Sequence, residues 1–600
     1  MKTFLLSLIT MIYASSSFAN AHGGPERIYN PPPSSLLKPQ MLRNLDFIKN
    51  TFESTYAPSV WKKKHFNWDL DVEIENAKKC VQGKKTITLD EYHEILKKFF
   101  KSTRDYHVNI RFTSTESATL PFTVKQSNNR YFFSYINREK LPLYAFPFEV
   151  GDELVSFGKQ STHDAVLEIK KNLLHNSGVL TGDGNDKTDH ALATEIFLTN
   201  RRNKSLPIPK GPIELKIRPK FSNHVESWQI AWEYRTEQIQ NPARTSLRYS
   251  RSLRNVTKKP SRSPSPILAQ QIHHLLSKEM ITAYWQASMR NEKSLKFNPH
   301  EFGGKKSFVP SLGKRVWESH PESPFDAYLF QTPAKDLIGY IRIPNYYPED
   351  PDYNVLCFAE IINWMESTSD ALVIDQLNNP GGYALYLYAL ASMLTDKALD
   401  TPKHQMAITQ RDVLSAIEAL PFLENIENND EAIEVLGPTF CGYVINYEFV
   451  QLCIHYFQFI INEWNAGRTL TQPYHLYGVD KIHPSPLAQY TKPILTLVNE
   501  LDMSGGDFFP SILQDNNRAK ILGERTAGAG GYISRVQYLN HLGIDFFTLT
   551  TSLAERTNKN PIENLGVTPD IQYNFTQMDL QFDYVEYVQK ILETLKTLHH

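Results

Sequence analysis

The sequence predicts a multidomain α/β protein, and three patterns that follow one another along the chain carry this prediction. Apolar residues before about residue 105 recur at helical spacing, and residues 115–235 form short β-like runs broken by turn residues. Beyond about residue 275, short apolar runs suited to buried strands alternate with helical segments. The 600 residues, 41% of them hydrophobic, suffice for packed cores in about three to five domains.

The first 21 residues have the composition of a cleavable signal peptide. Met1-Lys2 gives a positive start, Phe4 to Ala14 is apolar, and Ala19-Asn20-Ala21 supplies the small residues of a cleavage site. The apolar run is shorter than the roughly 20 residues that a membrane-spanning helix needs. We therefore expect a signal peptide over residues 1–21, export to the periplasm or outside the cell, and no membrane span in the mature chain.

A helical region is expected over residues 22–114. Near its end the spacing of apolar residues changes from that of a helix to that of a strand. Thr88 and Glu91 match the capping-box pattern of a helix start, and apolar residues then recur at helical spacing. Residues 108–112 alternate apolar and polar side chains, as a strand does. His107 therefore lies where helix changes to strand.

The next two regions differ sharply in composition. Residues 115–235 contain a turn at Gly151-Asp152 followed by a strand-like run, a pattern that resembles PDZ domains but also occurs in other hairpins. Residues 236–274 combine serine, proline, arginine and lysine, which predicts a flexible basic linker. This linker is either a solvated spacer or an inhibitory segment that is cleaved. The α/β pattern occupies residues 275–600.

Charge and cysteine content argue against several kinds of function. A net charge of −1 provides no field that would attract nucleic acid, so no nucleic-acid partner is expected. Cys80 and Cys357 are isolated; Cys441 and Cys453 could pair, but we expect buried free thiols. Neither C-x-x-C nor H-E-x-x-H occurs, so the sequence predicts no metal site. No organic cofactor is implied either.

Two glycine-containing turns follow buried-strand runs in the α/β region. In DQLNNPGG (375–382), Gly381 and Gly382 leave backbone N–H groups exposed, as an oxyanion hole requires. In VNELDMSGGD (498–507), Ser504 stands at the start of an expected helix, and Gly505 follows it directly in the sequence. Taken alone, the DQLNNPGG segment is equally well explained as an ordinary turn. Ser504 is equally well explained as a helix N-cap. Glu563 could orient a histidine, but by itself it is unremarkable.

Four motifs in order resemble the C-terminal processing (tail-specific) peptidases: DQLNNPGG, VNELDMSGGDF, LGERTAGAGGY and IENLGVTPD. That family places a PDZ domain before a ClpP-like (crotonase-like) catalytic core. The resemblance covers nearly the whole chain. It implies a serine endopeptidase that acts on proteins or peptides, with its catalytic core over residues 275–600.

One position departs from the family pattern and decides the expected mechanism. Members with a Ser/Lys dyad carry lysine between two glycines of the third motif, where this chain has Ala529. Alanine cannot accept a proton, so the base must come from elsewhere. Resemblance to members with a serine, histidine and glutamate triad implies Ser504 as nucleophile, His107 as base and Glu563 as the orienting carboxylate.

The resemblance carries further expectations, and two alternatives stay open. It implies an oxyanion hole formed by the N–H of Gly505 and one N–H of the Gly381-Gly382 pair. It also implies a homodimer and synthesis as a zymogen activated by internal cleavage. The alternatives are a Ser/Lys peptidase that uses a different lysine, and a ClpP-fold protein that binds ligands without catalysis.

Overall fold

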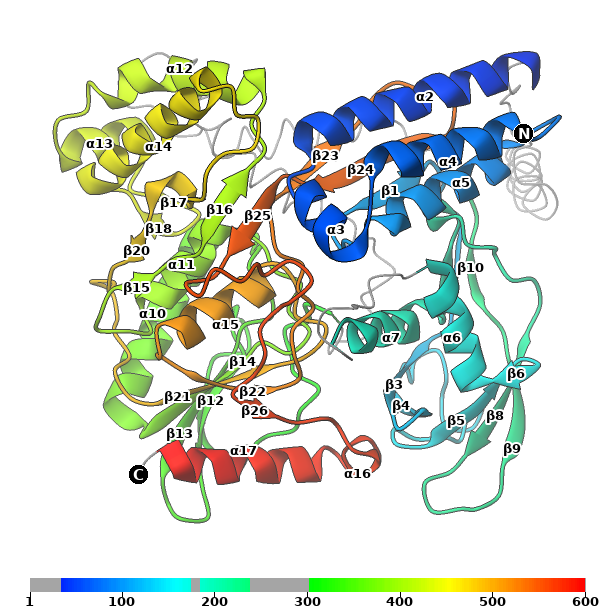
Figure 1. Ribbon diagram of the computed structural model, residues 1–600. Coiled ribbons are helices and arrows are strands. Elements are labelled where there is room, and N and C mark those ends of the chain that lie inside the picture. The colour runs from blue at the N-terminus through cyan, green and yellow to red at the C-terminus, as the bar shows by residue number, and fades with distance from the viewer. Residues whose placement is uncertain (1–33, 174–183, 238–301, 599–600) are drawn as a thin grey trace, which may run out of the picture.

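The computed structural model of the protein describes residues 34–173, 184–237 and 302–598. The predicted signal peptide (1–21) and nearly all of the predicted linker (236–274) lie outside the described residues. The described chain forms a helical N-terminal region, a β-rich region with two helices and a C-terminal α/β region (Figure 1). The predicted mixed α/β architecture is confirmed.

Four helices and one short strand make up the N-terminal region. At the last helix the predicted capping box is present: the N–H of Glu91 donates to Thr88 Oγ1 at 3.2 Å, and the N–H of Thr88 donates to the Glu91 carboxylate at 2.9 Å. The elements are α2 (Ser34–Thr55), α3 (Ser59–Phe66), α4 (Leu70–Gln82), α5 (Leu89–Ser102) and β1 (Asn109–Phe112).

Strand β1 pairs with the far end of the chain. It runs antiparallel to β24 (Ile544–Thr550), with Asn109 opposite Thr548, and β24 pairs in turn with β23 (Ile533–Val536). The apolar faces of the N-terminal helices bury against these strands in one core. This pairing fixes the segment just before β1 against the C-terminal region.

The β-rich region has its own core beneath a six-stranded sheet. The predicted turn at Gly151-Asp152 leads into β5, and the two helices were not predicted from the sequence. The sheet contains β3 (Phe122–Ser127), β4 (Arg130–Ile136), β5 (Glu153–Phe157), β6 (Gln160–Ser161), β8 (Ile213–Arg218) and β9 (Glu226–Ile230); β2 (Ser117–Thr119), β7 (Thr199–Arg201) and β10 (Glu233–Arg235) form a smaller sheet, and the helices are α6 (Thr162–Leu173) and α7 (Gly184–Ile196).

A seven-stranded sheet in the order β11-β12-β13-β14-β21-β22-β26 organises the C-terminal region. Strands β13, β14, β21, β22 and β26 are parallel, and β11 and β12 are antiparallel to their neighbours. The predicted buried strands correspond to β13, β14 and β21. The bounds are β11 (Lys314–Glu318), β12 (Ala327–Gln331), β13 (Leu337–Arg342), β14 (Ala371–Asp375), β21 (Ile494–Val498), β22 (Lys520–Gly523) and β26 (Ile571–Gln572).

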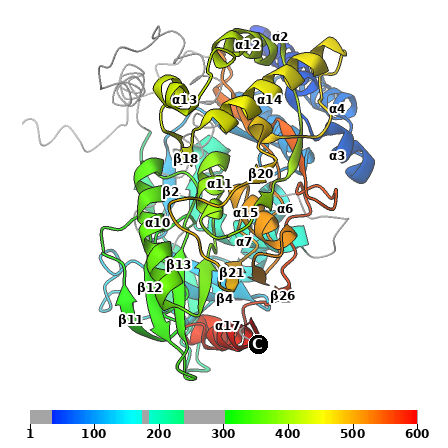
Figure 2. The ribbon, with the colours of Figure 1, turned by 90° about the vertical axis from the view of Figure 1, so that its left-hand side faces the viewer.

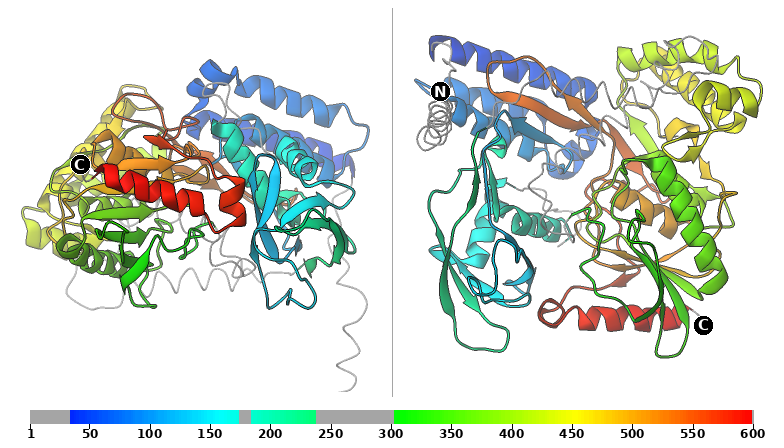
Figure 3. Two further views of the ribbon diagram at one scale, coloured as in Figure 1. Left: turned by 90° about the horizontal axis from the view of Figure 1, so that it is seen from below. Right: turned by 180° about the vertical axis from the view of Figure 1, so that it is seen from behind.

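Helices cover both faces of this sheet. Because side chains alternate along a strand, Leu372 and Ile374 pack on one face against α10 (Pro351–Thr368), α11 (Ala384–Ser392) and α15 (Gly505–Asp515). Ala371 and Val373 pack on the other face against α17 (Val585–Leu598). Figures 1 and 3 show α17 running along that second face.

A helical extension projects from the region between β14 and β21 (Figure 2). It contains α12 (Gln410–Leu423), α13 (Asn429–Leu436) and α14 (Tyr447–Asn465). Short strands join it to the core: β15 (Leu399–Asp400) with β20 (Lys481–Ile482), β16 (Lys403–Met406) between β19 (Tyr474–His475) and β25 (Ser552–Glu555), and β17 (Thr439–Phe440) with β18 (Tyr443–Val444). A short helix, α16 (Gln577–Gln581), precedes α17. None of the described helices combines the length and hydropathy needed to cross a bilayer.

Candidate active site

The predicted motifs converge because they follow neighbouring parallel strands. The turn at 376–383 follows β14, the turn at 499–504 follows β21, and the loop at 524–532 follows β22. The carboxyl ends of parallel strands lie at one edge of a sheet, which is where open α/β sheets bind ligands. Three of the four motifs therefore meet at this edge.

Ser504 lies in a strained turn at the start of α15. It is half-buried, and its backbone has φ 56° and ψ −116°. This combination lies outside the left-handed helical region, so it is costly for a residue with a Cβ, and strain of this kind clusters at functional sites. A strained strand-to-helix turn of this kind also presents the nucleophile of α/β hydrolases. This backbone geometry distinguishes Ser504 from an ordinary N-cap, which has extended backbone.

Asp507 fastens the Ser504 turn to the loop after β22. Its buried carboxylate accepts the N–H of Ser504 at 2.8 Å, the hydroxyl of Thr526 at 2.5 Å, and the N–H groups of Gly528 and Ala529 at 2.8 and 3.0 Å. Burial raises the pKa of Asp507 to about 6, while these hydrogen bonds oppose the rise. Sequence reasoning missed this residue, although its place three residues after Ser504 is the N3 position of a helix.

The Gly381-Gly382 turn passes close to the nucleophile. A Cβ atom at Gly381 would lie 2.5 Å from the backbone nitrogen of Gly505 and 2.7 Å from the Cβ of Ser504, so only glycine fits. Gly381 donates its own N–H to Asn379 Oδ1 at 2.8 Å. A Cβ atom at Gly505 would lie 3.1 Å from the nitrogen of Gly382. Within the predicted pair, Gly382 is therefore the better candidate for the oxyanion-hole donor.

Further hydrogen bonds join this turn to the Ser504 turn. The N–H of Met503 donates to the Asn379 carbonyl at 2.9 Å, and the N–H of Asn379 donates to Asp502 Oδ1 at 2.7 Å. Asp502 also accepts the N–H of Asn499 at 3.0 Å. The Gly381-Gly382 turn is thus fixed to the residues directly before Ser504, and such fixed backbone favours a preorganised oxyanion hole.

His107 is buried in the turn between α5 and β1, and its backbone is held at both ends. Its N–H donates to Asp105 Oδ1 at 2.8 Å, and its carbonyl accepts the hydroxyl of Thr548 at 2.6 Å. Asp105 accepts a further hydrogen bond from Thr550 at 2.7 Å. Strand β24 therefore positions the backbone of His107, which precedes Thr548 by 441 residues.

The residue before His107 places this turn beside the nucleophile turn. Tyr106 packs against a small apolar cluster formed by Leu501, Met503, Ala527 and Ala529. Met503 directly precedes Ser504, so the turns that carry His107 and Ser504 share one cluster. Ala529 is fully buried in it, which makes the position of the dyad lysine an apolar one in this chain.

Glu563 is fully buried beside the same loop. Its Oε2 accepts the N–H of Gly530 at 3.1 Å, and its Oε1 accepts a hydrogen bond from Lys62 Nζ at 2.5 Å. Burial and the nearby Asp105 carboxylate raise the pKa of Glu563 to about 8, while Lys62 and the Gly530 N–H lower it. Sequence reasoning missed Lys62, because a run of three lysines is typical of a solvated helix face.

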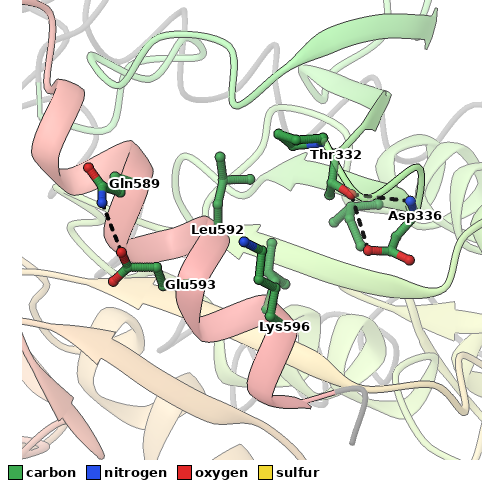
Figure 4. Close-up of a pocket in the computed structure, with 9 residues that line it drawn as sticks. Thr332, Asp336, Gln589, Leu592, Glu593 and Lys596 are labelled. Carbon is green, nitrogen blue, oxygen red and sulfur yellow. Dashed lines mark hydrogen bonds between the residues drawn. The ribbon is translucent and has the colours of Figure 1, made fainter.

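A pocket of about 220 Å³ lies elsewhere, between the β12–β13 turn and α17 (Figure 4). Thr332 and Asp336 line it from the turn, and Leu592 and Lys596 line it from the helix. It opens at the amino end of β13, and the strand-end turns of the candidate site lie at the opposite edge of the sheet. This pocket is separate from the candidate active site.

The comparisons with known proteins agree with this geometry. Residues 337–573 match the model of peptidase family S41, and residues 116–239 match a PDZ domain. The chain belongs to peptidase family S41 and is a serine peptidase, so the predicted tail-specific family and its PDZ-plus-catalytic-core fold class are confirmed.

Relatives from chlamydiae match the chain along nearly its whole length. It is 32% identical to an uncharacterised protein of Chlamydia muridarum over 100% of this chain and 98% of that protein. It is 34% identical to a Chlamydia trachomatis serovar D protein over 93% of this chain and 92% of that protein. The crystal structure of mature CPAF covers 94% of this chain and 98% of its own, with 30% identity and a TM-score of 0.77. A structure of mature CPAF complexed with lactacystin matches with 31% identity and the same TM-score.

Proposed function

We propose that this serine peptidase is an exported endopeptidase with a triad of Ser504, His107 and Glu563. The observation that carries the assignment of the nucleophile is the strained Ser504 turn, locked against glycine backbone at the carboxyl edge of the sheet. The position of the family's dyad lysine is the buried Ala529. A base from outside that loop is therefore needed, and the turn of His107 lies against the same cluster.

The proposed chemistry follows from the groups at this edge. Ser504 Oγ attacks the peptide carbonyl carbon while the imidazole of His107 takes the hydroxyl proton. The negative charge on the carbonyl oxygen is stabilised by the N–H groups of Gly505 and Gly382. The C–N bond breaks as His107 passes its proton to the leaving amine, and water then hydrolyses the acyl-enzyme. Glu563 stabilises the imidazolium.

For the alternative with a different lysine base, one candidate is Lys62, a described lysine that contacts a predicted triad residue. Lys62 is the only lysine among the described residues that is fully buried. Its Nζ donates to Glu563, to Asn564 Oδ1 and to the carbonyl of Arg104. An ammonium group with three acceptors has no free lone pair to accept a proton, which favours His107 as the base.

A fluorophosphonate probe tests whether the chain is an enzyme or a binding scaffold. We expect stoichiometric labelling of the folded protein at Ser504, located by peptide mass spectrometry, because only an activated serine reacts. The exposed Ser367 on α10 is the matched control, and Ser367→Ala should label normally. If the folded wild-type protein takes up no probe at Ser504 either before or after internal cleavage, the scaffold alternative is favoured.

We further propose that the chain is made as a zymogen and activated by cleavage between residues 241 and 266, which lie outside the described residues. This segment is rich in serine, proline and basic residues, a composition that favours entry into a protease cleft. Two solved structures that are similar to this chain are of mature CPAF. Purified wild-type protein should convert into two fragments that remain associated, whereas Ser504→Ala stays one chain on a denaturing gel. An active enzyme that remains uncut between residues 230 and 280 contradicts the zymogen, but leaves the triad untouched.

Export and assembly belong to the same proposal. The composition of residues 1–21 supports export through a signal peptide, to the periplasm or beyond. A homodimer is proposed from the family resemblance. The substrates are proteins or peptides, as the family implies.

A further inference from the structure

Lys62 connects the loop that carries Glu563 to the turn that carries His107. Its Nζ donates to Glu563 Oε1 at 2.5 Å, to Asn564 Oδ1 at 2.6 Å and to the carbonyl of Arg104 at 2.7 Å. Asn564 also donates to that Arg104 carbonyl, at 2.8 Å. One ammonium group and one amide therefore hold the two segments together.

The burial of this ion pair is not explained by stability alone. The side chain of Lys62 is 0% exposed and that of Glu563 is 1% exposed. Removing two charges from water costs about as much free energy as their attraction returns, so apolar residues would stabilise such a site equally well. A buried cation in contact with a candidate triad carboxylate therefore indicates a role in the site's electrostatics.

We propose that Lys62 is a positioning residue of the active site, which keeps Glu563 ionised and oriented so that its carboxylate stabilises the imidazolium of His107. This inference rests on the proposed triad. Lys62 does not take the proton from Ser504. It acts through Glu563.

Glu563 is affected by ionisable groups from three other parts of the chain. Lys62 approaches from α3, Asp105 from the turn after α5, and Tyr56 from the segment that follows α2. Burial and Asp105 raise the pKa of Glu563 to about 8, and Lys62 opposes them together with the Gly530 N–H. Removing the cation therefore raises the pKa of Glu563 further and leaves it neutral over a wider range of pH.

The expected pH effect follows from these directions. The proposed mechanism needs Glu563 ionised and His107 neutral, and both groups lose a proton as the pH rises. The kcat/KM of the wild type should therefore increase as the pH rises through the pKa of Glu563, which is about 8, and then level off. In Lys62→Met the increase should begin at higher pH, because Glu563 retains its proton longer. A substitution that only damaged the structure would lower kcat/KM at every pH without changing the pH at which it rises.

The test uses the full chain and a double-mutant cycle. Lys62→Met, Lys62→Gln, Glu563→Gln and the Lys62→Met/Glu563→Gln double variant are assayed on fluorescein-labelled casein at several pH values. Each variant is compared with wild-type protein that is in the same state of internal cleavage, either cut or uncut. The melting temperature of each variant is recorded. Lys64→Met is the matched control, because Lys64 is exposed on the same helix.

We expect Lys62→Met to lower kcat on the order of 10² to 10⁴-fold, no more than Glu563→Gln does, with little change in KM. In the Glu563→Gln background the same substitution should change kcat by less than about threefold, because the charge it supports is already absent. Lys62→Gln, which keeps polar contacts for Asn564 and Arg104, should show the same pH shift. Lys64→Met should match the wild type.

Several results would overturn the inference. Wild-type kcat and pH profile in either folded Lys62 variant would do so, as would equal losses from Lys62→Met with and without Glu563. If neither Lys62 variant melts cooperatively, the residue is structural and the inference also fails. A failure of the proposed function gives a different result. In that case Ser504→Ala would retain activity, whatever the Lys62 variants do.

Discussion

Ser504→Ala should abolish peptidase activity, with kcat falling on the order of 10⁶-fold. The substitution removes the atom that forms the acyl-enzyme, and only the oxyanion hole and substrate binding are left to assist water. The measurement is hydrolysis of fluorescein-labelled casein by the purified variant. Its melting temperature should stay close to that of the wild type, because a half-buried serine hydroxyl contributes little to packing.

The control for this experiment is Ser367→Ala, which removes an exposed hydroxyl from α10. It should cleave casein at the wild-type rate. Near-normal hydrolysis by the Ser504→Ala protein would refute the assignment of the nucleophile. A variant that is inactive but melts far below the wild type would require the more conservative Ser504→Thr as a second measure of the hydroxyl's role.

His107→Ala should cost about as much as loss of the serine, again on the order of 10⁶ in kcat. Without the imidazole nothing takes the Ser504 proton, because Ala529 stands where dyad peptidases carry their lysine. The readout is casein hydrolysis together with the rate of fluorophosphonate labelling of Ser504, and both should fall. The backbone contacts of residue 107 to Asp105 and Thr548 do not depend on its side chain, so the fold should survive.

His541→Ala is the matched control for the histidine, because it removes an exposed imidazole from the β23–β24 hairpin. Its activity should be unchanged. If His107→Ala keeps full activity while Lys62→Met and Lys62→Gln both lose it, the Ser/Lys alternative replaces the proposed triad.

Local sequence predicted much of the fold and most of the candidate site's parts. Buried-strand runs located β13, β14 and β21, and a capping box located α5, because these signals depend on residues close together in the chain. The strand-turn-helix context of Ser504 and of the Gly381-Gly382 pair was also predictable. The two helices α6 and α7 in the PDZ region were not, since short β-like runs dominate that stretch.

The family, the nucleophile candidate and the alanine at position 529 could be read from the sequence, because each belongs to a contiguous motif. How distant segments complete the site depends on tertiary packing. The pairing of β1 with β24 sets the place of His107, and the burial of Lys62 depends on acceptors at Arg104 and Glu563. The strand pairing and the buried cation are stabilised by partners that lie tens to hundreds of residues away along the chain, so no local pattern of residues can specify them.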